Sequence, residues 1–224
     1  MAQVHALRVF CDDDGSGGNP LGVFLDGRAV PERKRQAVAA DLGYAETVFV
    51  DDAARAELRI FTPEEALQFA GHPLVGTAWL LGRQRGDVPV LHPPAGDVPV
   101  RTEAELTFVA GRPEWCPPFE LVQAETPEEV EALTGPPEGK VLVGVWAWME
   151  EEGGIVRARV FVPVHGISED EATGSAAILL CAQLGRPLNI RQGRGSRILA
   201  RPLDDGMVEI GGRVELDEVR EHDA

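Results

Sequence analysis

Two apolar segments of the chain open on glycine, with polar side chains beside each opening. His72 follows Gly71 in the first segment, and Thr173 and Ser175 flank Gly174 in the second. If the segments are helices, their first turns carry unpaired N–H groups and a partial positive charge, which together bind carboxylates. Glycine lets a ligand approach the backbone closely. We therefore expect an anion site between the helix starts; relief of crowding between helix and sheet is the other explanation for the glycines.

Three side chains near these openings are suited to proton transfer. Glu46 comes directly before the apolar stretch Thr47–Val50, so we expect it at a strand end, where partial burial raises a carboxyl pKa. His72 lies in the first turn of an apolar segment, where burial and the helix dipole favour a neutral imidazole. Considered singly, Glu46 is typical of a solvated strand start, Asp170 of a helix-start acid, and His72 of a structural histidine.

Composition and missing motifs exclude several functions. The 224 residues include 37 Asp and Glu against 21 Lys and Arg, a net charge of −16, so we expect no nucleic-acid partner and no membrane partner. The loop Gly15–Gly18 lacks GxGxxG spacing and leads into Asn-Pro and a strand, unlike a dinucleotide-binding loop. The chain has no CxxC and no histidine pair at i, i+4, so we expect no metal site.

Cysteine use and hydropathy suggest a compartment. The three cysteines stand far apart in sequence, and no apolar run approaches the roughly 18 residues of a membrane span. Met1–Asp14 lacks the basic and apolar regions of a signal peptide. We predict a cytoplasmic protein with free thiols.

The elements that position these side chains follow from residue periodicity and breakers. Helices are predicted over 31–42, 71–85 and 173–185, the last two apolar on nearly every face and so expected to be central. A capping box at Thr126–Glu129 predicts a short fourth helix. A glycine-rich turn is expected over 14–20, and an acidic tail after Leu216. Strands are predicted at Val4–Phe10, Leu21–Leu25, Thr47–Val50, Glu57–Phe61, Glu105–Ala110, Lys140–Met149 and Ile155–Phe161.

A weak internal repeat indicates how these elements are arranged. Arg59–Pro63 and Arg159–Pro163 read RIFTP and RVFVP, and each precedes an apolar helix that opens on glycine. We predict an α/β (α+β) fold of two pseudo-symmetric halves, residues 1–101 and 102–224, each a curved sheet around one central helix. The last strand can return to the first half.

Five motifs, in order along almost the whole chain, resemble one family. They are Gly18–Leu21, Ala45–Phe49, Arg59–Pro63, Phe69–Ala78 and Glu169–Ala176. They are similar to the motifs of the PhzF (phenazine biosynthesis) family, which has the diaminopimelate-epimerase fold. The resemblance implies a cofactor-independent isomerase, usually a homodimer, in which a glutamate moves a proton between two carbons of a small carboxylate-bearing substrate. A phenazine-pathway member isomerises dihydro-hydroxyanthranilate.

The resemblance also implies roles for individual residues. The family's catalytic glutamate falls on Glu46, its Gly-His-Pro histidine on His72, and the aspartate and serine of its Glu-Asp-x-x-Thr-Gly-Ser motif on Asp170 and Ser175. The expected substrate-binding residues are Asn19, Gly71, Thr173 and Gly174.

Some positions depart from the pattern of the fold's relatives. Related epimerases carry a cysteine before each helix-opening glycine, where this chain has Ala70 and Thr173, which excludes two-thiol racemisation. The chain is shorter than typical members, mostly around residues 111–155, and Ala66 replaces a family glutamate. Two alternatives to the isomerase stay open. One is a non-catalytic protein that binds a small carboxylate, and the other is a different isomerase or lyase reaction using the same residues.

Overall fold

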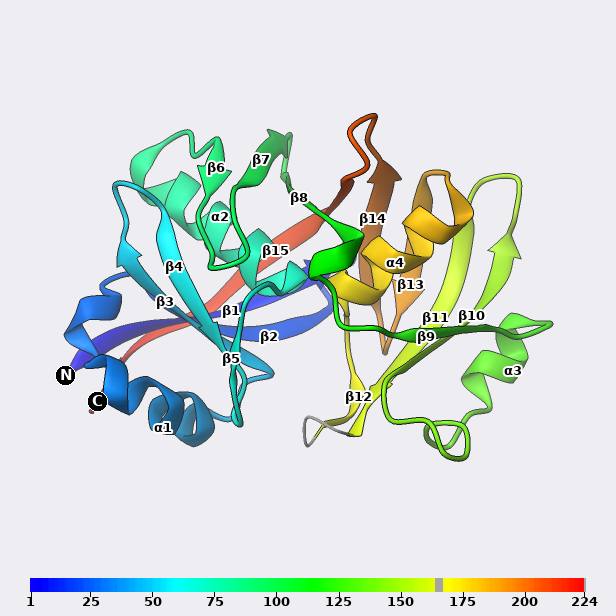
Figure 1. Ribbon diagram of the computed structural model, residues 1–224, viewed down its shortest axis with the longest axis horizontal. Coiled ribbons are helices and arrows are strands. Elements are labelled where there is room, and N and C mark those ends of the chain that lie inside the picture. The colour runs from blue at the N-terminus through cyan, green and yellow to red at the C-terminus, as the bar shows by residue number, and fades with distance from the viewer. Residues whose placement is uncertain (164–166, 224) are drawn as a thin grey trace.

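The computed structural model describes residues 1–163 and 167–223. Figure 1 shows two curved layers of strands lying side by side along the long axis, each wrapped around a helix. Helix α2 (Gly71–Arg85) lies in the first half and α4 (Gly174–Leu184) in the second. The predicted fold of two halves around central apolar helices is confirmed, and the three longer predicted helices form within a residue of their expected ends.

The chain as far as Gly111 contains eight strands and, besides α2, two further helices. Its elements are β1 (Ala2–Cys11), β2 (Gly17–Phe24), η1 (Gly27–Ala29), α1 (Glu32–Leu42), β3 (Glu46–Asp52), β4 (Glu57–Phe61), β5 (Ala66–Leu67), β6 (Val90–Leu91), β7 (Val98–Glu103) and β8 (Leu106–Gly111). The expected turn over 14–20 is wrong in its second part, because β2 already begins at Gly17. Two glycines with positive φ, Gly17 and Gly18, start that strand, and Cys11 pairs with Gly17 across the ladder.

The second half adds the remaining elements. They are η2 (Pro113–Trp115), β9 (Glu120–Gln123), α3 (Pro127–Glu131), β10 (Val143–Glu150), β11 (Ile155–Val162), β12 (Ile167–Asp170), β13 (Leu188–Gln192), β14 (Ser196–Pro202) and β15 (Val208–His222). The predicted acidic tail is wrong. Residues after Leu216 continue β15, which pairs with β1 as far as Ala2 opposite His222, and Asp217 accepts a hydrogen bond from Arg8.

Strand pairing repeats between the halves. The series β2–α1–β3–β4–β5–α2 matches β9–α3–β10–β11–β12–α4. In each series the first two strands pair in parallel and the next two pairs are antiparallel. After each central helix, the chain pairs in parallel with the third strand of the series. In the first half this is a single bridge between Glu57 of β4 and His92, and in the second half it is the pairing of β13 with β11. Strand β15 pairs with β1, β8 and β14 and so joins the two sheets.

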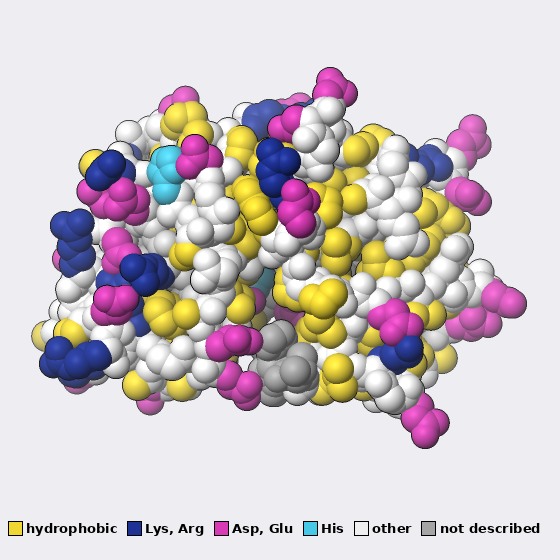
Figure 2. Space-filling view, viewed as in Figure 1, with side chains coloured by type: hydrophobic (Ala, Val, Ile, Leu, Met, Phe, Trp, Pro, Cys, Tyr) yellow, Lys and Arg dark blue, Asp and Glu magenta, His cyan; other side chains and the backbone are white. Residues whose placement is uncertain are grey.

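The central helices are buried because their faces are apolar all round. Leu74, Val75 and Leu81 of α2 and Ile178 and Cys181 of α4 are each at most 1% exposed. No helix in residues 1–163 or 167–223 is long and apolar enough to span a membrane. Figure 2 shows acidic side chains spread over the rim of one face and hydrophobic side chains gathered nearer its centre.

Candidate active site at the helix N-termini

The first turns of α2 and α4 meet at the junction of the halves. A Cβ atom added to Gly71 would lie 2.7 Å from the Cα of Gly174, so only glycine at both positions allows this approach. Their N-cap residues, Ala70 and Thr173, make no side-chain cap hydrogen bond. Because two helix N-termini converge here, the junction has a positive potential that favours an anion.

Glu46 and His72 face each other beside this junction. Glu46 is the first residue of β3, and His72 is the second residue of α2. Glu46 Oε2 lies 3.1 Å from His72 Nε2. The atoms are not aligned as a hydrogen bond, and neither has a hydrogen-bond partner among the described residues although both are buried. A buried carboxyl oxygen and an imidazole nitrogen without partners are polar groups ready to act on a bound molecule.

Asp170 belongs to a hydrogen-bonded network that crosses the junction. Asn19 of β2, 1% exposed, donates from Nδ2 to Asp170 Oδ1 (2.7 Å) and to the Ala172 carbonyl (2.9 Å). The same Nδ2 lies 3.3 Å from His72 Nδ1. Thr173 donates from Oγ1 to Asp170 Oδ2 at 2.6 Å. Both oxygens of Asp170 therefore accept hydrogen bonds, and Asn19 ties the acid of one half to the histidine of the other.

Burial separates the protonation states of these groups. Burial raises the pKa of Glu46 well above its usual value, and the charge of Asp170 raises it further. Burial also raises the pKa of Asp170, but hydrogen bonds from Thr173 and Asn19 oppose that rise. Burial lowers the pKa of His72 to about 3, so its imidazole is neutral near pH 7. Glu46 is accordingly the carboxyl that more readily holds a proton, and Asp170 the one whose ionised form accepts stabilising hydrogen bonds.

A small cavity opens between the acids and an apolar wall. Its volume is about 60 Å³, room for a few water molecules, so the lining must shift to admit a larger ligand. Its lining comprises Ala45, Glu46, Thr62, Leu67, Phe69, Ala70, Pro117, Phe119, Val162, Asp170, Thr173 and Ser175. None of these described residues is Lys or Arg, so backbone N–H groups and hydroxyls are the donors available to an anion.

The predicted site residues thus divide into two groups. Glu46, Asp170, Thr173 and Ser175 line the cavity. The other predicted residues, Asn19, Gly71, His72 and Gly174, adjoin these without lining it. Sequence reasoning missed the wall residues Pro117 and Phe119, which come from a stretch with no motif, and Gln192, which bonds Thr173 from β13.

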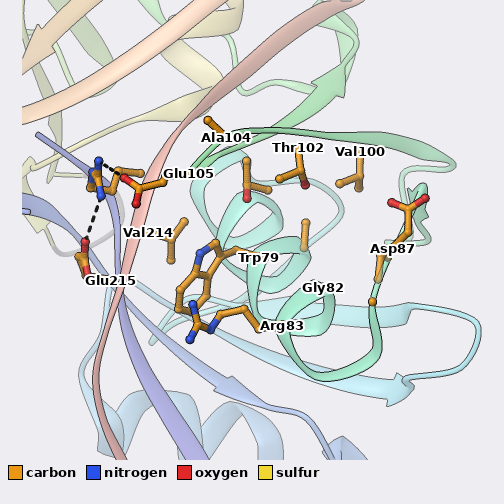
Figure 3. Close-up of a pocket in the computed structure, with 15 residues that line it drawn as sticks. Trp79, Gly82, Arg83, Asp87, Val100, Thr102, Ala104, Glu105, Val214 and Glu215 are labelled. Atoms are coloured by element: carbon orange, nitrogen blue, oxygen red, sulfur yellow. Dashed lines mark hydrogen bonds and ion pairs between the residues drawn. The ribbon is translucent and has the colours of Figure 1, made fainter. Parts of the chain in front are cut away.

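A larger cavity, of about 610 Å³, lies at the opposite end of α2 (Figure 3). Arg213 there is paired with Glu105 at 2.6 Å, and Arg83 stacks over Trp79 at 4.9 Å. Figure 3 shows the ion pairs of Glu105 and Glu215 at one edge of the opening, away from the Trp79 ring. The side chains suited to acid–base chemistry are at the smaller cavity, which Glu46 and Asp170 line and His72 adjoins.

The cysteines and possible metal ligands give no second centre. Cys116 adjoins the wall residue Pro117, and burial raises the pKa of its thiol to about 12, so it stays protonated. Cys11 and Cys181 are buried and free. Across the described ranges, no group of three His, Cys, Asp or Glu side chains is arranged to hold a metal ion.

Comparison with known proteins identifies the family of this chain. The family model for phenazine biosynthesis-like proteins, PhzC–PhzF, matches residues 7–134. Trans-2,3-dihydro-3-hydroxyanthranilate isomerase of Pseudomonas fluorescens is 31% identical, over 81% of this chain and 80% of that protein. This chain belongs to the PhzC–PhzF family. A relative in Deinococcus radiodurans, called an uncharacterized isomerase, is 30% identical over 89% of this chain and 82% of its own length. The chain is an isomerase of the PhzC–PhzF family.

Solved structures share the whole fold. A PhzC/PhzF protein from Clostridium difficile superposes with a TM-score of 0.81 at 21% identity, with full coverage of both chains. A predicted epimerase from Pseudomonas aeruginosa gives 0.77 at 26% identity, with 99% of both chains covered. A proline racemase from Agrobacterium radiobacter gives 0.64 at 12% identity over 93% of its chain. The last likeness shows that this chain shares its fold with a proline racemase.

Proposed function

We propose that this chain moves a proton between two carbons of a small, ring-bearing carboxylic acid, with Glu46 as the proton carrier. The substrate class follows the relatives named trans-2,3-dihydro-3-hydroxyanthranilate isomerase. The observation that carries the proposal is the buried contact of 3.1 Å between Glu46 Oε2 and His72 Nε2, two atoms without a hydrogen-bond partner among the described residues, beside two helix N-termini.

The proton steps balance within the site. Protonated Glu46 donates its proton to one ring carbon, and the resulting carboxylate removes a proton from a second carbon, which regenerates the acid. Neutral His72 faces the carboxyl throughout. Asp170, held ionised, favours the protonated form of Glu46 by charge repulsion.

The lining of the small cavity offers contacts to both the ring and the carboxylate of such a substrate. Leu67, Phe69, Phe119 and Val162 offer apolar contact to a ring. The first turns of α2 and α4, together with the hydroxyls of Thr173 and Ser175, offer donors to the substrate carboxylate. Direct substrate contacts by Asn19, Gly71 and Gly174 remain part of the proposal and require the lining to move.

Solvent-deuterium exchange tests this assignment. The chain is incubated in D₂O with trans-2,3-dihydro-3-hydroxyanthranilate, and deuterium at ring carbons is followed by NMR. Glu46→Gln should exchange about 10²–10⁴-fold more slowly. Glu57→Gln is the matched control, because Glu57 also begins a strand but lies on the surface, 42% exposed.

Two results would contradict the proposal. Exchange by Glu46→Gln at the parent rate would remove Glu46 from the proton transfer. A panel of carboxylates that bind the parent chain without ever exchanging would favour the non-catalytic binding protein instead.

We also propose that the protein is a homodimer in the cytoplasm. Within each chain, we place the division between the two halves near residue 101. Strands β5 and β9 end the long sheet, and pairing covers such edges. Three free cysteines suit a reducing compartment. Light scattering at micromolar concentration should give twice the 24.2 kDa chain mass; a value equal to one chain would contradict the dimer.

A further inference from the structure

Gln192 lies beneath the start of α4 with all of its polar atoms engaged. It is the last residue of β13 and is 2% exposed. Its Oε1 accepts a hydrogen bond from the Thr173 backbone N–H at 3.2 Å. Its Nε2 donates to Thr173 Oγ1 and to the Asp170 backbone carbonyl, each at 2.9 Å. One amide therefore holds the acid and the hydroxyl on either side of the turn that enters α4.

Counting donors and acceptors fixes the direction of the next hydrogen bond. Gln192 gives an amide hydrogen to Thr173 Oγ1, so the hydroxyl accepts there and has its own hydrogen left to donate. That hydrogen is directed at Asp170 Oδ2, 2.6 Å away, while Asn19 donates to Oδ1. Both carboxyl oxygens of Asp170 face donors, which favours the ionised form over the acid.

We propose that Gln192 is a positioning residue that, through the hydroxyl of Thr173, determines which of the two cavity carboxyls carries the proton. With Asp170 held as an acceptor of two hydrogen bonds, the proton stays on Glu46, where the proposed reaction needs it. The link to catalysis rests on the proposed function, whereas the location of the proton does not. Gln192 touches neither the ring nor the carboxylate in this scheme and acts only through Thr173 and Asp170.

The other charges around Asp170 do not replace this effect. Glu169 disfavours the ionised form of Asp170, and Glu46 repels Asp170 only when Glu46 is itself ionised. Glu169 is itself paired with Arg159 at 2.5 Å. Glu171 accepts hydrogen bonds from the Arg194 backbone N–H and from a serine hydroxyl, and His72 is neutral. No described cation contacts Asp170, so its ionised form depends on the donors from Asn19, Thr173 and the Glu171 backbone N–H.

The test is a carboxyl titration of the free protein. Side-chain ¹³C-carboxyl NMR follows Asp170 and Glu46 with pH, with the two signals assigned from Asp170→Asn and Glu46→Gln. In Gln192→Met, whose flexible side chain fills the same space, we expect the Asp170 midpoint to rise by about one pH unit. The Glu46 midpoint should fall, because a protonated Asp170 no longer repels the Glu46 carboxylate.

A second variant separates hydrogen-bond direction from loss of helix support. Gln192→Glu keeps an acceptor for the Thr173 N–H but donates nothing to Oγ1 at neutral pH, so the Asp170 midpoint should rise here too. Ile190→Val, on the same strand, is the control that loses buried volume without touching the network and should move neither midpoint.

A rise of the Asp170 titration midpoint together with a fall of the Glu46 midpoint in the Gln192 variants supports the proposal. If both Gln192 variants lose thermal stability with both midpoints unmoved, Gln192 is only structural and the proposal is overturned. If the midpoints move but the parent chain turns over no substrate, the proposed function fails while this inference stands. If turnover exists, the pH profile of kcat/KM should move with the Glu46 midpoint.

Discussion

The buried imidazole of His72 should make the fold sensitive to acid. The side chain is 3% exposed, and burial lowers its pKa from 6.5 to about 3. In the unfolded chain the same imidazole takes up a proton near pH 6.5. Between pH 6.5 and 3 the unfolded state therefore binds more protons, so the free energy of unfolding falls as the pH falls. The contribution is fully present above pH 6.5.

The size of this effect follows from the two pKa values. From pH 6.5 down to pH 4 is 2.5 units, and each unit is worth at most about 1.4 kcal/mol. Because the imidazole is only partly protonated near each pKa, the loss from this one group is about 3 kcal/mol. Glu46 acts with the opposite sign. Its pKa is raised in the folded state, so the protonated carboxyl favours folding at low pH and that benefit is lost as the pH rises through the folded value. A variant is needed to separate the two groups.

His72→Gln keeps a polar group near the Nε2 position and removes the titration. Urea unfolding of parent and variant, followed by tryptophan fluorescence at pH 7 and pH 4, gives the two pH dependences. We expect the parent to lose about 3 kcal/mol more than His72→Gln over this range. His92→Gln changes an exposed histidine and should behave as the parent. Equal pH dependence in parent and His72→Gln would refute the argument from burial.

Three further changes test the site from other directions. Gly174→Ala should destabilise the fold by about 1–3 kcal/mol in urea unfolding, because the new methyl group meets the facing helix and Ile210, whereas Gly82→Ala, with open space around it, should stabilise by about 0.5–1 kcal/mol. Asn19→Leu should lower kcat more than it raises KM, since it removes a donor to Asp170; an unchanged kcat would count against its role. Glu46→Gln should unfold at a higher temperature than the parent at alkaline pH and not at pH 4, and calorimetry that finds no such crossover would contradict its raised pKa.

The central helices could be predicted because their signals are local. Gly71 and Pro73 begin α2, Gly185 ends α4, and apolar residues on every face require burial wherever the helices lie. The capping box at Thr126 also forms, although its glutamate bonds the Glu125 N–H instead of the N–H of Thr126. Such features depend on residues only a few positions apart.

Other features depend on partners far along the chain. The two-residue strands β5 and β6 exist only through pairing, and no periodicity is visible in so short a segment. The acidic end of β15 has no apolar pattern of its own and becomes a strand because β1 lies opposite. Gln192 lies 22 residues from Asp170, and one glutamine in a strand carries no signal until the turn into α4 packs on it.

The duplicated fold explains where the site is, and its asymmetry explains what the site can do. Each half supplies one helix N-terminus, and the halves meet at paired glycines, so the anion-binding potential is symmetric. The groups proposed to transfer the proton are not arranged symmetrically. Glu46 begins β3, but Val143 occupies the matching start of β10; Asp170 ends β12, where Leu67 ends β5. In the proposed mechanism, one half thus contributes the acid that carries the proton, and the other contributes the carboxylate that keeps it there. Asn19, which bonds across the junction, couples the two.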